Sequence, residues 1–497
     1  MKRRFETRWL ALAASLVLAL GGAAGAGPER SADAAVIGAE NHPKLLARFG
    51  GEIPDEALIN YVATIGARIV AVSEQPDEDW QFTVLDSPSV NAFALPGGYV
   101  YITRGLLALA GDEAELAAVL GHEIVHVTAA HVEARLAVQA EDNSGELVGD
   151  LLGGLLGGLI SGSESPLADA VRNTVESAVG GQMEFSREQE FEADALSIPI
   201  LVAAGYDPYA AADFLVAMRA QYALVARLEG RGFNPSQVPF FADHPAPDER
   251  IARARDLAES MAYIQPPVRG TEPYLAAIDG MIFGDSRAQG MVRGRAFIHS
   301  ELGFSFLVPE GFTLQNTAQA VRARGPDGAM LIMEGGRDRG GDLRRFIADE
   351  WAPALRQTGQ ARPRLSRVRS TEINGLEAAQ ARLTRRFRGR NQEMTLTAIR
   401  LNGTIYRFTA LSARGADTAQ GAMAEAVASF AALPVDAGAA LAPYILTAHQ
   451  LRAQDSVASL TADAPAESAA ADWFAVLNGL EPGELPPVGS WVKVIRY

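Results

Sequence analysis

The chain of 497 residues contains no cysteine. A disulfide, a cysteine nucleophile and a thiolate metal ligand are therefore all excluded, and any metal site must use histidine, aspartate or glutamate. Basic residues are also fewer than acidic ones, with 44 Lys and Arg against 60 Asp and Glu and a net charge of -16. This acidic balance argues against nucleic acid as a general partner.

Long apolar runs are absent beyond the amino-terminal segment, so no later stretch is expected to span a bilayer. At the amino terminus, basic residues precede the apolar run 9–20, and small residues follow it. This layout predicts a secretory signal peptide over residues 1–26. An uncleaved membrane anchor is the alternative, which the short apolar core disfavours. We therefore expect an exported, periplasmic protein.

One helix-forming stretch carries the strongest chemical signal in the chain. Apolar residues recur at helical spacing between Asp112 and Val138, no proline interrupts them, and alanine is abundant. His122 and His126 are four residues apart, so a helix places both imidazoles on one face, about one turn apart. Glu123 lies beside them and can take a proton from water. The stretch therefore predicts a helix that offers two Zn²⁺ ligands and a general base.

A His-Glu-x-x-His string also arises by chance on solvated helix faces. Here the flanking residues, 117–120 and 124–125, are apolar, which predicts that this helix is buried. Buried ionisable groups are costly unless they are paired or bound to a metal. The setting of the string therefore favours the metal interpretation.

A second helix, expected over residues 183–204, supplies acidic partners. Glu190 and Asp194 are four residues apart and share one face of this helix. Glu190 can complete a site of three protein ligands, which leaves one position for water. Asp194 can accept a hydrogen bond from the ring N–H of a ligating histidine and so fix the tautomer of that ring.

His131 is a further histidine close to the predicted site. It follows His126 one residue too early for the extended three-histidine zinc motif, and the glycine of that motif is absent. We interpret His131 as an ordinary polar helix residue.

Strands are expected before the metal helix, one over residues 81–85 and a pair formed by 90–95 and 99–103. An edge strand in this region could bind an extended peptide by strand addition, with Asn91, Ala92 and Phe93 contacting the substrate. An ordinary hairpin in a small sheet explains the same pattern equally well.

A Leu/Gly-rich segment, residues 147–160, follows the metal helix. It is too short to span a bilayer, and its glycines weaken a helix. We interpret it as a mobile cover over the site or as a surface for peripheral contact with a membrane or partner. A plain packed loop is the alternative.

The combined motifs resemble those of zinc peptidases in the CAAX-prenyl-protease/HtpX group, and within it the exported BepA-type peptidases. The likeness covers roughly residues 36–265, which form the expected peptidase domain. It rests on residues 90–98, on the strings Gly121 to His126 and Ser186 to Asp194, and on Asp243-His244-Pro245 and Glu249-Arg250-Ile251.

The resemblance implies a zinc metalloendopeptidase with Glu190 as the third ligand. It also implies that His244 and Arg250 sit over the zinc, where they handle the substrate carbonyl or where the histidine blocks the water. The substrates that it implies are unfolded or misassembled cell-envelope proteins, and the process is protein quality control.

The remainder of the chain divides into three expected parts. Residues 266–290 contain proline and scattered glycine and predict a linker, while 291–435 predict an α+β domain weakly similar to Mog1/PsbP-like domains. Residues 440–497 resemble a LysM module of βααβ order. The expected fold class is therefore α+β and multidomain, beginning with a mainly helical, zincin-like peptidase domain that contains a small β-sheet.

The carboxy-terminal module leaves the partner open. A LysM resemblance implies contact with peptidoglycan glycans, and docking to an envelope complex is the alternative. BepA-type proteins usually carry tetratricopeptide repeats here, but no such repeat is visible, which puts a chaperone role in doubt.

Two functions are compatible with the sequence. The first is the secreted zinc endopeptidase of envelope quality control. The second is a non-proteolytic envelope assembly or binding factor with a regulatory metal site. The intact Glu123 favours the first, because a vestigial site has no need of its base.

Overall fold

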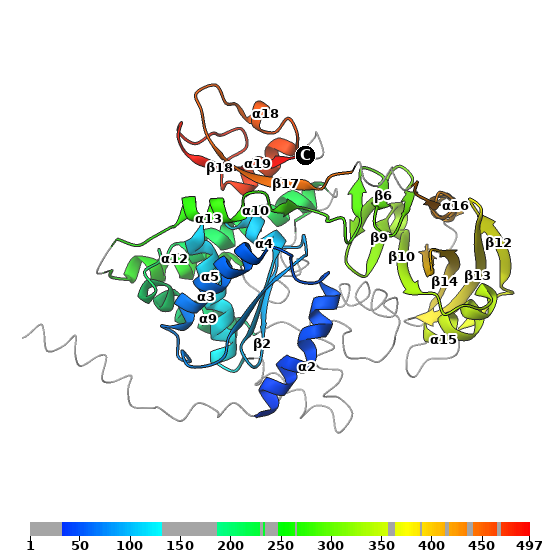
Figure 1. Ribbon diagram of the computed structural model, residues 1–497, viewed down its shortest axis with the longest axis horizontal. Coiled ribbons are helices and arrows are strands. Elements are labelled where there is room, and N and C mark those ends of the chain that lie inside the picture. Colours follow the sequence, from blue (N-terminus) through cyan, green and yellow to red (C-terminus); the bar gives the residue numbers. More distant parts are fainter. Residues whose placement is uncertain are drawn as a thin grey trace, which may run out of the picture.

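A computed structural model of the chain has α+β architecture, with a helix-rich part, a sheet-rich part and a small carboxy-terminal unit (Figure 1). The α+β class predicted from the sequence is confirmed. The signal segment 1–26, the Leu/Gly-rich segment 147–160 and His244 lie outside the described residues. Those described are 32–131, 186–228, 232–233, 247–263, 266–355, 363–387, 390–412, 417–434, 441–464 and 469–497.

A three-stranded sheet lies in the helix-rich part of the chain. Its strands are β1 (Gln81–Leu85), β2 (Ala92–Leu95) and β3 (Tyr99–Thr103), in the order β1-β3-β2. The central strand β3 is parallel to β1 and antiparallel to β2. Gly97 and Gly98 adopt positive φ between β2 and β3, which only glycine does at little cost. Among the described residues, β2 is an edge strand of this sheet, as strand addition would require.

Helix α5 is the centre of the helix-rich part and is buried along nearly its whole length. It packs against α3, α9, α10 and the sheet strand β2, which explains why its apolar residues surround it on all sides. Asp112 caps its first turn by accepting a hydrogen bond from the backbone N–H of Glu115 at 3.0 Å. The helices of this part are α2 (Ala32–Arg48), α3 (Glu56–Val70), α4 (Arg104–Leu109), α5 (Glu113–Thr128), α9 (Arg187–Ala203), α10 (Ala210–Leu228) and α12 (Pro247–Ser260). Among the described residues, no helix combines the length and the apolar character that crossing a membrane requires.

The helix predicted between Asp112 and Val138 was drawn too long. Helix α5 ends at Thr128, and Ala130 has a φ of 54°. A left-handed conformation interrupts a right-handed helix, and a residue with a side chain adopts it at an energetic cost. His131, directly after this break, is therefore not part of α5.

Residues 266–290 are not the open linker that their composition suggested. They contain α13 (Thr271–Ile278) and β4 (Ile282–Phe283). Tyr274, Leu275 and Ile278 are buried in the same core as α3, α4 and α5. The proline and glycine residues predicted a loop, but burial of these apolar side chains stabilises a helix here instead.

The sheet-rich part contains two antiparallel sheets. Asn374-Gly375 and Asn402-Gly403 adopt positive φ at the hairpins where these dipeptides predicted turns. One sheet has eight strands and the other has the order β16-β7-β6-β5. Their strands are β5 (Met291–Arg293), β6 (Ala296–His299), β7 (Phe304–Leu307), β8 (Thr313–Asn316), β9 (Ala320–Arg324), β10 (Met330–Arg337), β11 (Arg364–Leu365), β12 (Arg369–Ile373), β13 (Leu376–Phe387), β14 (Arg390–Leu401), β15 (Thr404–Leu411) and β16 (Ala431–Ala432). The accompanying helical segments are α14 (Leu343–Arg345), η3 (Phe346–Trp351), α15 (Ala352–Ala354) and α16 (Asp417–Ala428).

The carboxy-terminal unit packs directly on the helix-rich part (Figure 1). Its elements follow the expected βααβ order: β17 (Tyr444–Gln450), α18 (Val457–Leu460), α19 (Ala470–Leu477) and β18 (Trp491–Arg496). Strand β17 pairs with β18 and also with β4, so the unit shares a sheet with the segment expected to be a linker. Leu446, Leu477 and Ile495 enter the core around α5. The unit is therefore an integral part of the fold rather than a tethered module.

Lys493 on β18 links this unit to the segment just before α5. Its side chain is buried, and its ammonium group donates hydrogen bonds to the carbonyl oxygens of residues 108–110 at 2.8 to 2.9 Å. These carbonyls lie at the end of α4, where helical acceptors lack partners within the helix. Lys493 therefore satisfies three buried acceptors from the far end of the chain.

We predict that Lys493→Met lowers the midpoint of thermal unfolding of the full chain by several degrees. Methionine keeps the length of the side chain but leaves the three carbonyls without their donor, at a cost of about 2 kcal/mol. Calorimetry of the parent and the variant measures the difference. Lys44→Met, at an exposed lysine, is the control. Equal midpoints for Lys493→Met and the parent would contradict this account of β18.

Candidate metal centre

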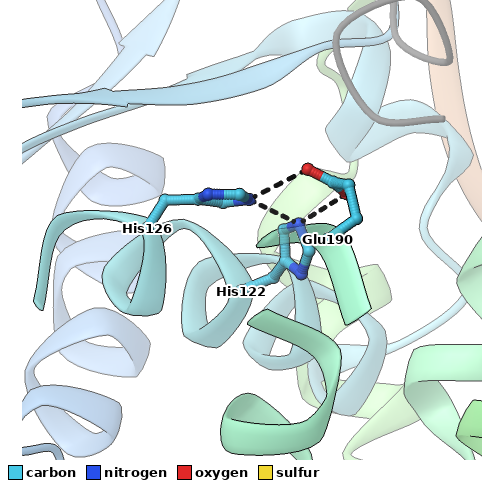
Figure 2. A group of neighbouring side chains, drawn as sticks. All are labelled: His122, His126 and Glu190. Atoms are coloured by element: carbon cyan, nitrogen blue, oxygen red, sulfur yellow. Dashed lines mark hydrogen bonds and ion pairs between the residues drawn. The ribbon is translucent and has the colours of Figure 1, made fainter. Parts of the chain in front are cut away.

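Three buried side chains converge where α5 packs against α9. His122 and His126 project from α5 and Glu190 from α9 (Figure 2). The Nε2 atoms of the two histidines are 3.0 Å apart. Glu190 places Oε1 3.2 Å from His126 Nε2 and Oε2 3.4 Å from His122 Nε2. The residues are 6%, 1% and 0% exposed, respectively, so bulk water competes little for these atoms.

The spacing of these donor atoms fits one tetrahedral metal ion. Zinc bound by nitrogen or oxygen at roughly 2.0–2.1 Å in tetrahedral geometry holds its ligand atoms about 3.3 Å apart. The separation of the two histidine nitrogens is 3.0 Å, and the Glu190 oxygen nearest each of them lies at 3.2 Å (Oε1 to His126) or 3.4 Å (Oε2 to His122), so all three are close to that value. Two imidazole nitrogens and a carboxylate also form a donor set that zinc accepts. His122, His126 and Glu190 would therefore hold such an ion.

A capping box determines where α9 begins and so where Glu190 lies. The Ser186 hydroxyl oxygen accepts a hydrogen bond from the Gln189 backbone N–H at 3.1 Å. The Gln189 side-chain oxygen accepts one from the Ser186 backbone N–H at 2.9 Å. This reciprocal pair starts the helix at Arg187 and places Glu190 in its first turn. Asp194 then follows one turn later on the same face.

Asp194 contacts the ring nitrogen of His122 that faces away from Glu190. Its Oδ1 lies 3.1 Å from His122 Nδ1, the arrangement expected from the four-residue spacing of the two acids. A carboxylate in this position draws the ring proton to Nδ1 and leaves Nε2 with a lone pair for a metal.

Arg250 on α12 contacts two of the carboxylates of α9, those of Asp194 and Glu190. Its Nε and Nη2 donate to the two oxygens of Asp194 at 2.7 Å each, and Nη1 lies 2.7 Å from Glu190 Oε2. The sequence resemblance placed Arg250 over the metal, toward a substrate carbonyl. In the structure it contacts Glu190 and Asp194, and its Nη2 also lies 3.5 Å from both ring nitrogens of His122. Contact with a substrate stays a prediction.

The charges of the cluster favour a cation at its centre. Burial raises the pKa of Asp194, but Arg250 and His122 outweigh burial and lower this pKa to about 2. Burial and Arg250 lower the pKa of His122, but hydrogen bonds to Asp194 and Glu190 outweigh them and raise it to about 9. The carboxylates of the site thus favour a positive charge on His122. A divalent ion bound between these residues would compensate the same negative charges in place of that proton.

Glu123, the expected base, is buried and follows His122 on α5. Of the expected substrate contacts, Ala92 is buried in β2, and Asn91 directly precedes that strand. Asn91 Oδ1 is buried and has no hydrogen-bond partner in the part of the chain that the structure describes. The ring of Phe93 stacks on Tyr101 with centroids 4.9 Å apart. The Phe93 side chain therefore packs against Tyr101. Only its backbone N–H and C=O groups would be used to hydrogen-bond an added peptide strand.

His131 lies closer to the candidate site than its sequence position predicts. It is buried rather than an ordinary polar helix residue, with an exposed fraction of 4%. Its Nδ1 lies 3.0 Å from His126 Nδ1, and its Nε2 lies 3.3 Å from Glu192 Oε2. No spacing rule predicts this contact, because it depends on the change of direction at Ala130.

Part of this chain is similar to known proteins. Residues 56–258 match the profile of peptidase family M48. The chain is 30% identical over 244 residues to the putative beta-barrel assembly-enhancing protease of Vibrio cholerae serotype O1, covering 49% of this chain and 47% of that protein. It is 32% identical over 209 residues to the beta-barrel assembly-enhancing protease of Escherichia coli K12, covering 42% of this chain and 40% of that protein. The chain thus spans about half the length of the curated relatives it matches.

A solved structure also aligns with part of the chain. The solution structure of cyanobacterial PsbP from Synechocystis sp. PCC 6803 aligns with 30% of this chain and 98% of its own, at 14% identity and a TM-score of 0.23.

We predict that Glu190→Gln weakens zinc binding strongly and leaves the fold intact. The amide preserves the shape of the side chain but removes the negative charge that the metal would bind. Zinc per chain, measured by mass spectrometry after dialysis, should fall well below the parental value. Glu188→Gln, an exposed residue on the same helix, is the control. Unchanged zinc in Glu190→Gln would remove Glu190 from the site.

Proposed function

Residues 56–258 form a domain of peptidase family M48, and from this premise we propose that the protein is a zinc-dependent endopeptidase of the cell envelope. The observation that carries the proposal is the buried cluster of His122, His126 and Glu190, with Glu123 on the same helix. This arrangement combines a metal-binding donor set with a carboxylate base, as peptide hydrolysis requires.

The proposed mechanism assigns a separate task to each residue. When bound, zinc polarises the peptide carbonyl and makes water a stronger acid. Glu123 takes the proton of the attacking water and passes it to the nitrogen of the leaving amine. Asp194 keeps His122 in one tautomer, and Arg250 fixes Asp194 and Glu190 in place through contacts at 2.7 Å. Because these groups are buried, bulk water competes little for their hydrogen bonds.

We further propose that the substrate binds as an added strand on β2. This edge strand packs against α5, so an extended peptide paired with Asn91, Ala92 and Phe93 would lie beside the metal helix. Strand addition requires a chain whose backbone groups are free, which favours unfolded or misassembled proteins. The relatives from V. cholerae and E. coli are named beta-barrel assembly-enhancing proteases, which supports envelope proteins as the substrates and an exported, periplasmic location.

His244 is proposed to act at the fourth metal position, as the family resemblance implies. It would either occupy that position at rest or donate a hydrogen bond to the developing oxyanion. Arg250 already contacts two carboxylates, which favours His244 for the direct role. Segment 147–160 is proposed to cover the site or to touch the membrane surface.

The βααβ order of the carboxy-terminal unit supports a LysM-like module, with peptidoglycan or an envelope complex as its proposed contact. Its burial against the peptidase helices means that a ligand there would bind to the peptidase itself rather than to a separate anchor. A non-proteolytic assembly factor would use the same contacts without turnover, so an activity assay separates the two functions.

We predict that Glu123→Gln retains zinc and lowers the cleavage of an unfolded casein substrate by roughly 10²- to 10⁴-fold, because the amide cannot accept the proton. Cleavage by the parent should stop with 1,10-phenanthroline and return with added zinc. Glu272→Gln, at an exposed position on α13, is the control.

Three results would count against the proposal. Cleavage by Glu123→Gln near the parental rate would remove Glu123 as the base. Insensitivity of the parent to the chelator would remove the metal mechanism. A parent that binds zinc and cleaves no unfolded substrate would favour the assembly factor.

A further inference from the structure

We propose that His131 is a positioning residue that fixes the tautomer and ring orientation of His126 and links that ligand to the carboxylate of Glu192. The inference rests on the proposed metal site, since it assigns His126 to the metal. His131 would support His126 in the way that Asp194 supports His122.

The three side chains form a continuous chain of contacts that leads from the metal cluster to the surface. The imidazoles of His126 and His131 meet edge to face, with centroids 5.0 Å apart and an interplanar angle of 71°. Their Nδ1 atoms are 3.0 Å apart, and His131 Nε2 lies 3.3 Å from Glu192 Oε2. His131 is buried, whereas the Glu192 side chain is 57% exposed.

Counting protons gives one arrangement that satisfies these contacts. His126 Nε2 faces His122 and Glu190 and must be free of a proton to bind a metal. The single proton of a neutral His126 ring then sits on Nδ1, which donates to His131 Nδ1. His131 must accept there, so its own proton sits on Nε2 and donates to Glu192. A proton on His131 Nδ1 would instead set two N–H groups against each other at 3.0 Å.

The two ligand histidines therefore receive different support on Nδ1. His122 Nδ1 contacts a carboxylate that Arg250 holds, while His126 Nδ1 contacts a neutral ring. Supporting groups of this kind orient a ligand and raise its basicity, and removing one typically weakens metal binding. Glu192 acts from an exposed position where water screens its charge, so most of the effect should belong to His131.

The backbone around His131 is consistent with a defined position. Ala130, directly before it, adopts a φ of 54°, which costs energy for a residue with a side chain. Such conformations persist where surrounding contacts determine them, and they concentrate at functional sites. After this left-handed residue, His131 contacts His126 in the last turn of α5.

The experiment compares zinc affinity in His131→Leu and His131→Asn, each in the full chain. Leucine fills space without accepting a hydrogen bond, whereas the side-chain oxygen of asparagine can accept from His126 Nδ1–H. Competition with a chromophoric chelator measures the dissociation constant. We expect Leu to weaken zinc binding by about 10- to 100-fold, and Asn to recover most of that loss. Glu192→Gln should weaken it by at most about fivefold, and Glu188→Gln should leave it unchanged.

Two further readouts separate positioning from a general structural role. The visible spectrum of the Co²⁺-loaded protein should change in His131→Leu and return toward the parental spectrum in His131→Asn. Thermal unfolding in chelator should differ little between these two variants, because it does not depend on the metal contact.

The possible outcomes are distinct. A parental zinc affinity in His131→Leu would overturn the inference, and so would equal losses in Leu and Asn, which would indicate a role in filling space. Failure of the parent itself to bind zinc would overturn this inference together with the proposed function. Zinc binding by the parent with an unaffected His131→Leu would leave the proposed function intact.

Discussion

The buried guanidinium of Arg250 is the group on which the arrangement of the candidate site depends. It brings one positive charge between Glu190 and Asp194, with three contacts at 2.7 Å. Two carboxylates placed this close in a buried site would otherwise repel each other and resist ionisation. Arg250 therefore allows α9 to present both acids to α5, and it ties α12 to the same junction. Truncating one of these side chains would be costly, because the remaining charges lose their compensation, whereas an amide of the same shape still accepts a hydrogen bond from Arg250.

Helix α5 is supported at both ends as well as at its centre. At its start, Arg269 donates to Asp112 at 2.6 Å and to Glu115 at 3.2 Å, and Lys493 holds the preceding carbonyls. At its end, His131 contacts His126. The position of the two histidines thus depends on residues from the middle and the carboxy terminus of the chain as well as on the residues around α5 itself. The carboxy-terminal unit shares the core of the peptidase helices, so its stability and that of the site are linked.

Features that follow from helical or strand periodicity could be predicted from the sequence. Four-residue spacing placed His122 beside His126 and Glu190 beside Asp194, because a helix repeats every 3.6 residues. The Asn-Gly dipeptides located two hairpins, because their residues accept positive φ.

Features that depend on contacts between distant segments could not be predicted in this way. The end of α5 depends on the conformation of Ala130, which nothing in the local composition signals. The sequence pattern predicts Lys493 only as a residue of a strand, because its carbonyl partners lie far away in the sequence. The same holds for α13, where packing of Tyr274 outweighed nearby glycine and proline.

The central claim is that His122, His126 and Glu190 bind one zinc ion in the native protein. X-ray absorption at the zinc edge tests it most directly, because the scattering of an imidazole ring differs from that of a carboxylate or water. The account predicts about one zinc per chain, with two imidazoles and additional oxygen ligands at roughly 2.0–2.1 Å. A spectrum without imidazole scattering, or a purified protein that takes up no zinc, would contradict it.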